Sequence, residues 1–244
     1  MSEFFAGPNG LEIAFRLTRG NGPLTVFLPG YMSDMAGGKA NAVFDWAMAN
    51  GRSCLLLDYS GCGGSEGNFA DGTLSRWRDE VLALIDHVGA GEVVLVGSSM
   101  GGWLMLLVGL ALGQRLKGLV GIAAAPDFTH WGFTDAQRET IRDAGVLYED
   151  NPYGPEPTPT WRGLYDDGVA NELLRSEIAI DCAVRLLHGQ ADADVPWHIS
   201  VQLAAALRSR DVRLTLVKDG DHRLSRATDI ALLLDILGQV SQDG

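Results

Sequence analysis

The strongest constraint on the fold of this chain is a regular alternation between short apolar runs and longer segments of helical length. Most of the short runs are continuous, which is typical of strands buried on both faces of a parallel sheet, and the longer segments repeat their apolar residues with the period of a helix. The expected strands cover residues 24–28, 54–57, 93–96, 119–123, 184–187 and 212–217. The expected helices cover residues 40–50, 74–88, 101–112, 199–209 and 227–240. The pattern predicts an α/β fold with a mostly parallel, doubly wound sheet, led by a hairpin strand at residues 12–17.

One region interrupts this alternation. Residues 127–178 show no clear strand and are too long for an ordinary loop. The region is rich in proline and in aromatic residues, namely Pro152, Pro155, Pro157, Pro159, Trp131, Phe133, Tyr148, Tyr153, Trp161 and Tyr165. We expect an inserted cap of short helices and a proline-rich turn. The predicted organisation is a core of residues 1–126 and 179–244 with a cap of residues 127–178.

Charge and hydropathy exclude several classes of partner. A net charge of −12 disfavours nucleic acid and anionic membrane surfaces, because both are polyanions. The longest apolar run, residues 103–112, is far shorter than the roughly 20 residues that span a bilayer. The first residues, MSEFFAGPNG, have no basic or apolar leader. We therefore expect a soluble, cytoplasmic protein that acts on small molecules or proteins; nothing indicates its oligomeric state.

The pattern G-x-S-x-G occurs twice, and only one match lies in the context that makes a serine nucleophilic. In GSSMG, residues 97–101, the first glycine follows an expected strand directly and the last begins an expected helix. Such a strand-turn-helix elbow lifts the serine hydroxyl clear of the backbone toward a base. The spacing selects Ser99 and leaves Ser98 as a turn residue.

The second match, GGSEG, lies beyond its strand and is followed by loop sequence, so Ser65 is interpreted as a loop residue near the site. The overlapping GCGGSEG lacks the last glycine of a dinucleotide-binding loop, because Glu66 stands there. Cys62 has no neighbouring histidine to activate a thiol. The three cysteines are odd in number and have no C-x-x-C spacing, which argues against disulfides and a zinc knuckle.

A nucleophilic serine needs a carboxylate and a histidine, which follow it in that order in this kind of architecture. The strand at 184–187 leads to Asp192 and Asp194, and the strand at 212–217 leads to His222. Both loops lie where ligands are expected, beyond the carboxyl ends of the strands. His222 is the only one of the five histidines that follows a separate strand beyond the acids. The two aspartates lack a matching histidine cluster, so we expect no metal and no cofactor.

Five stretches together resemble the α/β-hydrolase fold of serine hydrolases. They are FLPGYMSDM (27–35), DYSGCGGSEGNF (58–69), GSSMGGWLML (97–106), RLLHGQADADVPWH (185–198) and DHR (221–223). More narrowly, the chain resembles the mitochondrial acyl-protein thioesterases and acyl-glucuronide esterases of the α/β-hydrolase-domain-containing group, from about residue 11 onward. We expect no targeting segment like theirs from the first residues, and the cap shows little match.

The resemblance implies a role for each matching residue. Ser99 would be the nucleophile, His222 the general base and then acid, and Asp192 the carboxylate that orients the histidine. Asp192 occupies the aspartate of the pattern H-G-x-x-D-x-x-V-P, whereas Asp194 falls at a variable position; exchanged roles stay open.

The oxyanion would bind two backbone N–H groups. One belongs to Met100, directly after the nucleophile, and the resemblance places the other at Tyr31, after Pro29 and Gly30.

These residues predict a serine hydrolase that cleaves carboxylic esters or thioesters, of small molecules or acylated proteins, through an acyl-enzyme intermediate. The aromatic cap suggests an apolar acyl group, although such residues also form a cap's own core. Alternatives are peptide or C–C bond hydrolysis on the same triad, or a ligand-binding member of the fold without activity. A dehalogenase is disfavoured, because its nucleophile would be aspartate where this chain has Ser99.

Overall fold

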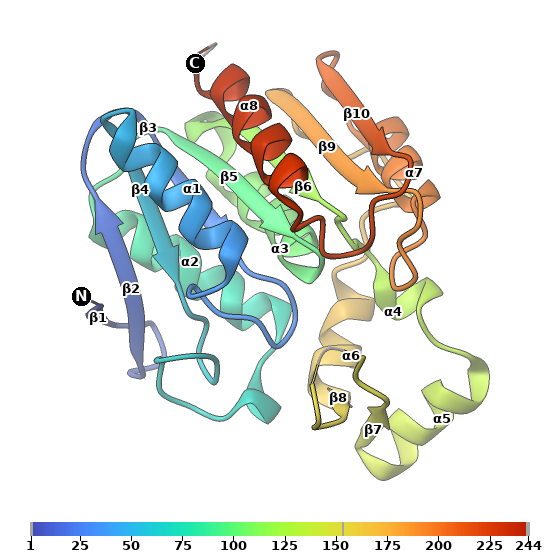
Figure 1. Cartoon of the computed structure of the whole chain (residues 1–244). Helices are drawn as coiled ribbons and strands as arrows, with labels where there is room; N and C mark the ends of the chain where they lie inside the picture. Colours follow the sequence, from blue (N-terminus) through green and yellow to red (C-terminus); the bar gives the residue numbers. More distant parts are fainter. Residues whose placement is uncertain (1, 153, 243–244) are drawn as a thin grey trace.

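A single eight-stranded sheet forms the centre of the computed structural model, which describes residues 2–152 and 154–242 (Figure 1). The strand order is β1-β2-β4-β3-β5-β6-β9-β10. The strands are β1 (Glu3–Ala6), β2 (Glu12–Thr18), β3 (Asn21–Leu28), β4 (Arg52–Leu57), β5 (Val93–Ser98), β6 (Leu116–Ile122), β9 (Ala183–Gly189) and β10 (Val212–Val217). Strands β1 and β2 pair antiparallel, β2 pairs antiparallel with β4, and the others pair in parallel. The α/β fold expected from the sequence is confirmed.

The order of the strands reverses at β3, and this reversal determines where a site can form. From β3 the chain pairs β4 on one side and then crosses to pair β5 on the other. The loops that leave β3 and β5 therefore diverge to opposite faces of the sheet and open a crevice between them. The segments with Tyr31 and Ser99 follow these two strands, at their carboxyl ends.

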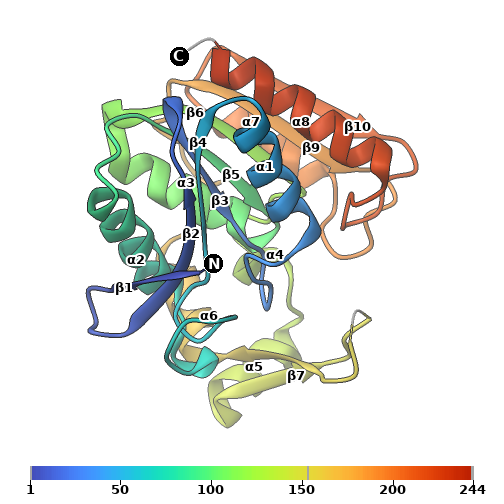
Figure 2. The same ribbon diagram turned by 60° about the vertical axis from the view of Figure 1, so that its left-hand side comes forward.

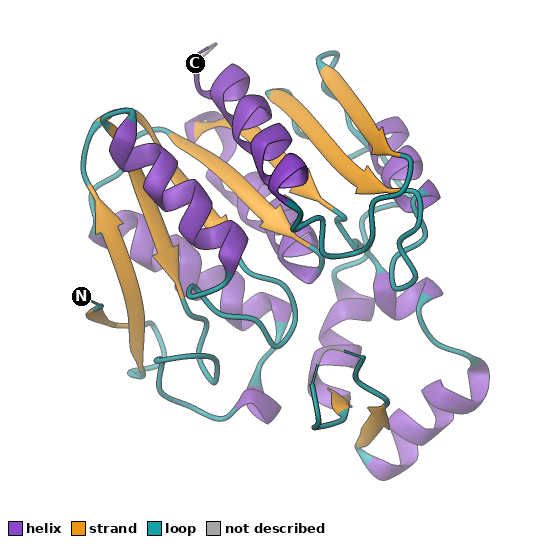
Figure 3. Cartoon of the chain, viewed as in Figure 1, coloured by secondary structure: helices purple, strands orange, loops and turns teal. Residues whose placement is uncertain are grey.

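Helices cover both faces of the sheet (Figure 3). Helices α1 (Gly38–Ala49) and α8 (Ala227–Gln242) pack on one face, and α2 (Leu74–His87), α3 (Met100–Leu112) and α7 (His198–Ala206) pack on the other. Short 3-10 turns, η1 (Phe69–Asp71) and η2 (Gly113–Arg115), lie before α2 and after α3. Alternate residues of β5 belong to opposite layers: Val93 and Leu95 to the core under α3, and Val94 and Val96 to the core under α1 and α8. Both faces are buried, which explains why this strand is a continuous apolar run.

The segment between β6 and β9 stands beyond the carboxyl ends of the parallel strands (Figures 1 and 2). It contains α4 (Phe128–Trp131), α5 (Asp135–Ala144), β7 (Val146–Glu149), β8 (Thr158–Trp161) and α6 (Arg162–Ala170). The expectation that this region has no strand is wrong, because β7 and β8 form an antiparallel pair. Each strand has only four residues and Pro159 lies within β8, so neither shows the apolar run of a buried strand. Tyr153 lies outside the described residues.

Within the described residues, no helix combines the length and the apolar character that crossing a bilayer requires.

Candidate active site

Ser99 lies at a sharp turn between a strand and a helix. Strand β5 ends at Ser98, α3 begins at Met100, and Ser99 between them has a φ of 55° and a ψ of −122°. A positive φ is strained for a residue with a side chain and persists where the surroundings hold it in place. Here the backbone packs so closely around the turn that positions 97 and 101 have no room for a side chain. A Cβ on Gly97 would lie 2.3 Å from the Gly101 carbonyl oxygen, and a Cβ on Gly101 would lie 2.1 Å from the Leu28 carbonyl oxygen. The G-x-S-x-G spacing is thus a steric requirement of this turn.

Three side chains from separate loops meet at the carboxyl edge of the sheet. Nε2 of His222 lies 3.0 Å from Oγ of Ser99, and Nδ1 lies 2.9 Å from Oδ2 of Asp192. Ser99 follows β5, Asp192 follows β9 and His222 follows β10. Chain positions 99, 192 and 222 converge because these strands run parallel in one part of the sheet, in the order β5-β6-β9-β10, and end at the same edge. The Asp192 side chain is fully buried, whereas His222 keeps 15% of its side-chain surface exposed.

Asp192 is held as a carboxylate by the groups around it. Burial opposes its ionisation, but hydrogen bonds from His188, His222 and the Val195 amide outweigh burial and hold the pKa of this carboxyl below its usual range. Oδ1 accepts the backbone N–H groups of Asp194 and Val195 at 2.9 and 2.8 Å. An ionised, immobilised carboxylate keeps the Nδ1 proton of His222 in place, so Nε2 is the nitrogen free to accept a proton.

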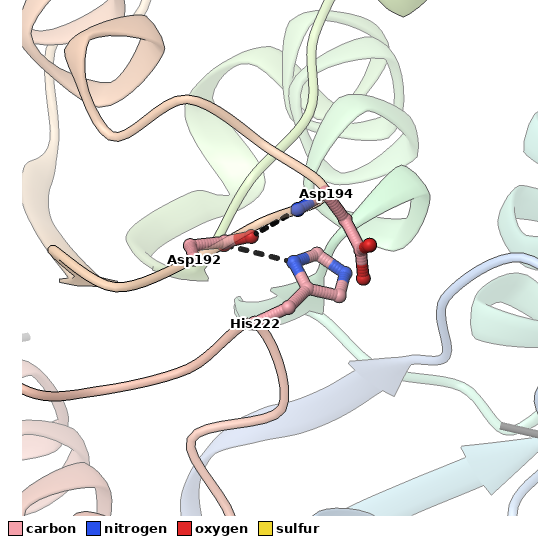
Figure 4. A group of neighbouring side chains, drawn as sticks. All are labelled: Asp192, Asp194 and His222. Atoms are coloured by element: carbon pink, nitrogen blue, oxygen red, sulfur yellow. Dashed lines mark hydrogen bonds and ion pairs between the residues drawn. The ribbon is translucent and has the colours of Figure 1, made fainter. Parts of the chain in front are cut away.

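Asp194 lies beside the same histidine, on the exposed side (Figure 4). Asp192, Asp194 and His222 each offer one metal-ligand atom within 4.8 Å of the others, a grouping that the sequence did not suggest. Both ring nitrogens of His222 already face partners, Asp192 and Ser99. A cation bound by these three residues would compete with those contacts.

The loop after β3 approaches the serine closely. A Cβ on Gly30 would lie 3.3 Å from Cβ of Ser99. Residues 30–33 form a tight turn in which Ser33 N–H donates to the Gly30 carbonyl at 3.1 Å and Met32 has a positive φ of 54°. Among the described residues, neither the Tyr31 nor the Met100 N–H donates to a protein acceptor. Two such donors beside one serine are what a developing oxyanion requires.

The segment after β4 holds this loop at both ends. The Tyr59 hydroxyl donates to the carbonyl of Pro29 at 3.1 Å, and the Asp58 carboxylate accepts the Met35 N–H at 2.7 Å. Asp58 also accepts the Gly64 N–H at 2.8 Å. These two positioning residues were missed in the sequence, where Asp58 and Tyr59 were noted only as part of a matching stretch.

The two alternative nucleophiles considered in the sequence are Ser65 and Cys62. The Ser65 hydroxyl accepts the Ala14 N–H at 2.8 Å and donates to the Asp58 carbonyl at 2.7 Å, which ties its loop to β2. Cys62 is buried, and burial raises the pKa of its thiol to about 12, so it is not a ready thiolate.

His188 is a further residue that the sequence did not single out. Its Nε2 lies 3.1 Å from Oδ2 of Asp192 and 3.0 Å from the Val195 carbonyl oxygen; both are acceptors, so Nε2 carries the proton. Nδ1 lies 2.7 Å from the Ser200 hydroxyl, and the side chain is completely buried. Asp192 Oδ2 therefore contacts two histidines, His222 and His188. The sequence feature that could have indicated His188 is the histidine at the first position of the pattern H-G-x-x-D.

Comparison with known proteins agrees with the class that this fold and geometry indicate: the chain belongs to the α/β-hydrolase family, whose model matches residues 25–235. It is 37% identical to the human palmitoyl-protein thioesterase ABHD10, mitochondrial, over 241 residues that cover 95% of this chain and 77% of the relative. The solved structure of α/β-hydrolase domain-containing protein 10 from mouse shares 35% identity and a TM-score of 0.91 over 98% of both chains. A protein from Agrobacterium vitis shares 38% identity and a TM-score of 0.93, over 99% of this chain and 98% of its own. The family resemblance seen in the sequence is confirmed, and these relatives support hydrolase activity.

The cytoplasmic location expected from the sequence is wrong by the same comparison, because the curated relatives are named as mitochondrial proteins. The expectation rested on the first residues of the chain. Targeting is carried by a removable segment and not by the packed domain. The charge and fold of the hydrolase domain therefore contain no information about the compartment.

Proposed function

We propose that this chain is a serine hydrolase that cleaves carboxylic ester or thioester bonds of acyl substrates, with Ser99, His222 and Asp192 as its triad. The observation that carries the proposal is the continuous hydrogen-bonded chain from Ser99 Oγ through both ring nitrogens of His222 to Asp192, at 3.0 and 2.9 Å. A serine on a strained elbow, in contact with an oriented imidazole, is the arrangement that acyl transfer requires.

The proposed reaction has two steps, acylation of Ser99 and hydrolysis of the acyl-enzyme. His222 Nε2 takes the Ser99 proton while Oγ attacks the substrate carbonyl carbon, and the Tyr31 and Met100 amides stabilise the oxyanion. The intermediate collapses, the bond to the alcohol or thiol breaks, and His222 gives that leaving group the proton. Water then attacks the acyl-enzyme and loses a proton to His222, which returns it to Ser99 as the carboxylic acid leaves. No group beyond these side chains and amides is needed for the proton balance.

We also propose that residues 127–178 act as a cap that binds the acyl group. Three half-buried aromatic residues of this segment contact one another in series, Phe128 with Phe133 at 6.2 Å and Phe133 with Tyr165 at 5.8 Å between ring centroids. Phe128 in turn meets the buried ring of Trp103, in α3, edge-on at 5.3 Å. Aromatic surface of this kind suits an apolar acyl chain, and the curated relatives are named palmitoyl-protein thioesterases.

Labelling with a fluorophosphonate, which reacts with activated serines, tests the triad. We expect the wild-type protein and Ser65→Ala to be labelled and Ser99→Ala to be unlabelled. Labelling that survives Ser99→Ala but disappears in Ser65→Ala would contradict the assignment. An absence of labelling in the wild type would favour the inactive, ligand-binding alternative.

A series of matched oxoesters and thioesters with increasing acyl length tests the substrate class. We expect kcat/KM to rise with chain length if the cap binds the acyl group. A flat profile would contradict the apolar acyl site. Peptidase activity without ester or thioester hydrolysis would contradict the proposed reaction.

A further inference from the structure

Tyr31 makes contacts with both the core and the cap. Its hydroxyl donates a hydrogen bond of 2.6 Å to the carbonyl oxygen of Pro159, 128 positions away in β8. Its ring packs against Phe69 with centroids 5.0 Å apart. Burial raises the pKa of the phenol above its usual range, so the hydroxyl stays protonated as a donor.

The inner half of the cap is fastened to the core independently of Tyr31. Asp167, in α6, accepts the Ser75 N–H at 2.9 Å, and the Trp103 indole donates to the Asn171 carbonyl at 3.2 Å. Within the cap itself, the Asp127 carboxylate joins the two ends of the segment by accepting the Leu173 and Leu174 N–H groups at 2.8 Å each.

The outer half of the cap, α5 with β7 and β8, stands further from the sheet (Figures 1 and 2). Its hydrogen bonds run mainly within the cap, for example from Gln137 to Glu149 at 2.9 Å and from the Arg162 N–H to the Gly145 carbonyl at 2.9 Å. The bond from Tyr31 therefore joins this outer half to the loop beside Ser99.

The core side holds the two ends of that loop. The Tyr59 hydroxyl fixes the carbonyl of Pro29, and Asp58 fixes the Met35 amide, at its two ends. Tyr31 lies between these two points, so the middle of the loop is the part that the cap contacts.

We propose that Tyr31 is a positioning residue that determines acyl specificity: its phenol fastens the β7–β8 hairpin to the loop whose backbone forms the oxyanion hole. Substrates whose acyl chain reaches the hairpin then depend on this bond, and binding such a chain also steadies the loop beside Ser99. The inference rests on the proposed ester or thioester hydrolysis.

The test removes one hydroxyl and keeps the ring, the backbone amide and the contact with Phe69. In Tyr31→Phe, we expect the ratio of kcat/KM for a dodecanoyl thioester to that for the acetyl thioester to fall about tenfold, the effect of one hydrogen bond, mainly through a higher KM for the long chain. Hydrogen exchange should become faster in residues 146–161 and stay unchanged in α8.

Two tyrosines serve as matched controls. Tyr148 lies on the same hairpin and is 56% exposed, so Tyr148→Phe should change neither the ratio nor the exchange rates. Tyr59→Phe removes a hydroxyl that holds the same loop from the segment after β4, so it should lower kcat for both chain lengths and leave the exchange of residues 146–161 unchanged.

Unchanged exchange of residues 146–161 in Tyr31→Phe would overturn the proposal, and so would an unchanged chain-length ratio. The exchange measurement needs no turnover, so it remains decisive even if the protein proves not to hydrolyse acyl substrates. In that case faster exchange would still show that the Tyr31 hydroxyl fastens the β7–β8 hairpin, and only the proposed hydrolysis of acyl substrates would be contradicted.

Discussion

Asp192→Asn is the substitution whose consequence follows most directly from the geometry. Oδ1 of Asp192 accepts two backbone N–H groups, from Asp194 and Val195, and Oδ2 faces Nδ1 of His222 at 2.9 Å and Nε2 of His188 at 3.1 Å. Only an oxygen can accept the two amides, so the asparagine carbonyl will keep that place. Its NH₂ group then replaces Oδ2 and donates toward Nδ1 of His222.

This exchange moves a proton to the wrong nitrogen. With Nδ1 of His222 acting as acceptor, the imidazole proton lies on Nε2, which can then no longer take the proton of Ser99. Loss of the correct tautomer in a Ser-His-Asp triad lowers kcat about 10⁴-fold, which corresponds to about 5 kcal/mol of transition-state stabilisation. The NH₂ group also opposes the Nε2–H of His188, so the folded state loses stability as well.

Hydrolysis of a short p-nitrophenyl ester and the rate of fluorophosphonate labelling measure this loss, and ¹⁵N NMR of the histidines reports the tautomer. Asp194→Asn is the matched control, because it removes the same charge two residues away while Oδ2 of Asp192 still faces Nδ1 of His222; we expect it to cost less than about tenfold. The reasoning is refuted if Asp194→Asn loses as much activity as Asp192→Asn. It is also refuted if Asp192→Asn keeps more than about a tenth of the wild-type kcat/KM.

Three further predictions concern the groups around the triad. Gly101→Ala places a Cβ 2.1 Å from the Leu28 carbonyl oxygen and should destabilise the protein by about 3 kcal/mol or more in urea unfolding; Gly38→Ala, which meets nothing within 4 Å, should be close to neutral, and equal effects would contradict the steric argument. His188→Leu removes one hydrogen bond to the carboxylate and should lower kcat about 10- to 100-fold, and a loss as large as that of Asp192→Asn would mean that His188 itself transfers protons. The pKa of the Asp192 carboxyl in the folded state lies below its usual range, so the ionised carboxylate stabilises the folded state. This stabilisation is fully present above the pKa of the unfolded state, about 4, and is lost as the pH falls through the folded-state pKa. Urea unfolding at about pH 5 and about pH 2 should therefore show a larger loss of stability in wild type than in Asp192→Asn, and parallel losses would count against the shift.

The central strands and helices could be predicted because their burial is written directly in the residues. Strand β5 was expected at residues 93–96, within its observed bounds, and α2 was expected to within one residue, because the first is a continuous apolar run and the second is a clear amphipathic segment. The strands β7 and β8 were missed because they are short and half-buried, and one contains a proline. Their pairing depends on contact with each other and not on a local pattern.

Within the candidate site, the sequence by itself determined the choice of Ser99 and His222, because the features that select them are local: a strand-turn-helix elbow, and a loop after a separate strand. The resemblance favoured Asp192 over Asp194 and left exchanged roles open, and only the tertiary structure places Asp192 against Nδ1 of His222 and His188 against the same carboxylate. The tertiary structure also decided that the Tyr31 hydroxyl meets Pro159 at 2.6 Å across 128 positions of chain. The physical reason is that a hydrogen bond depends on distances of a few tenths of an ångström, and for residues on different loops those distances are set by how the strands and helices pack.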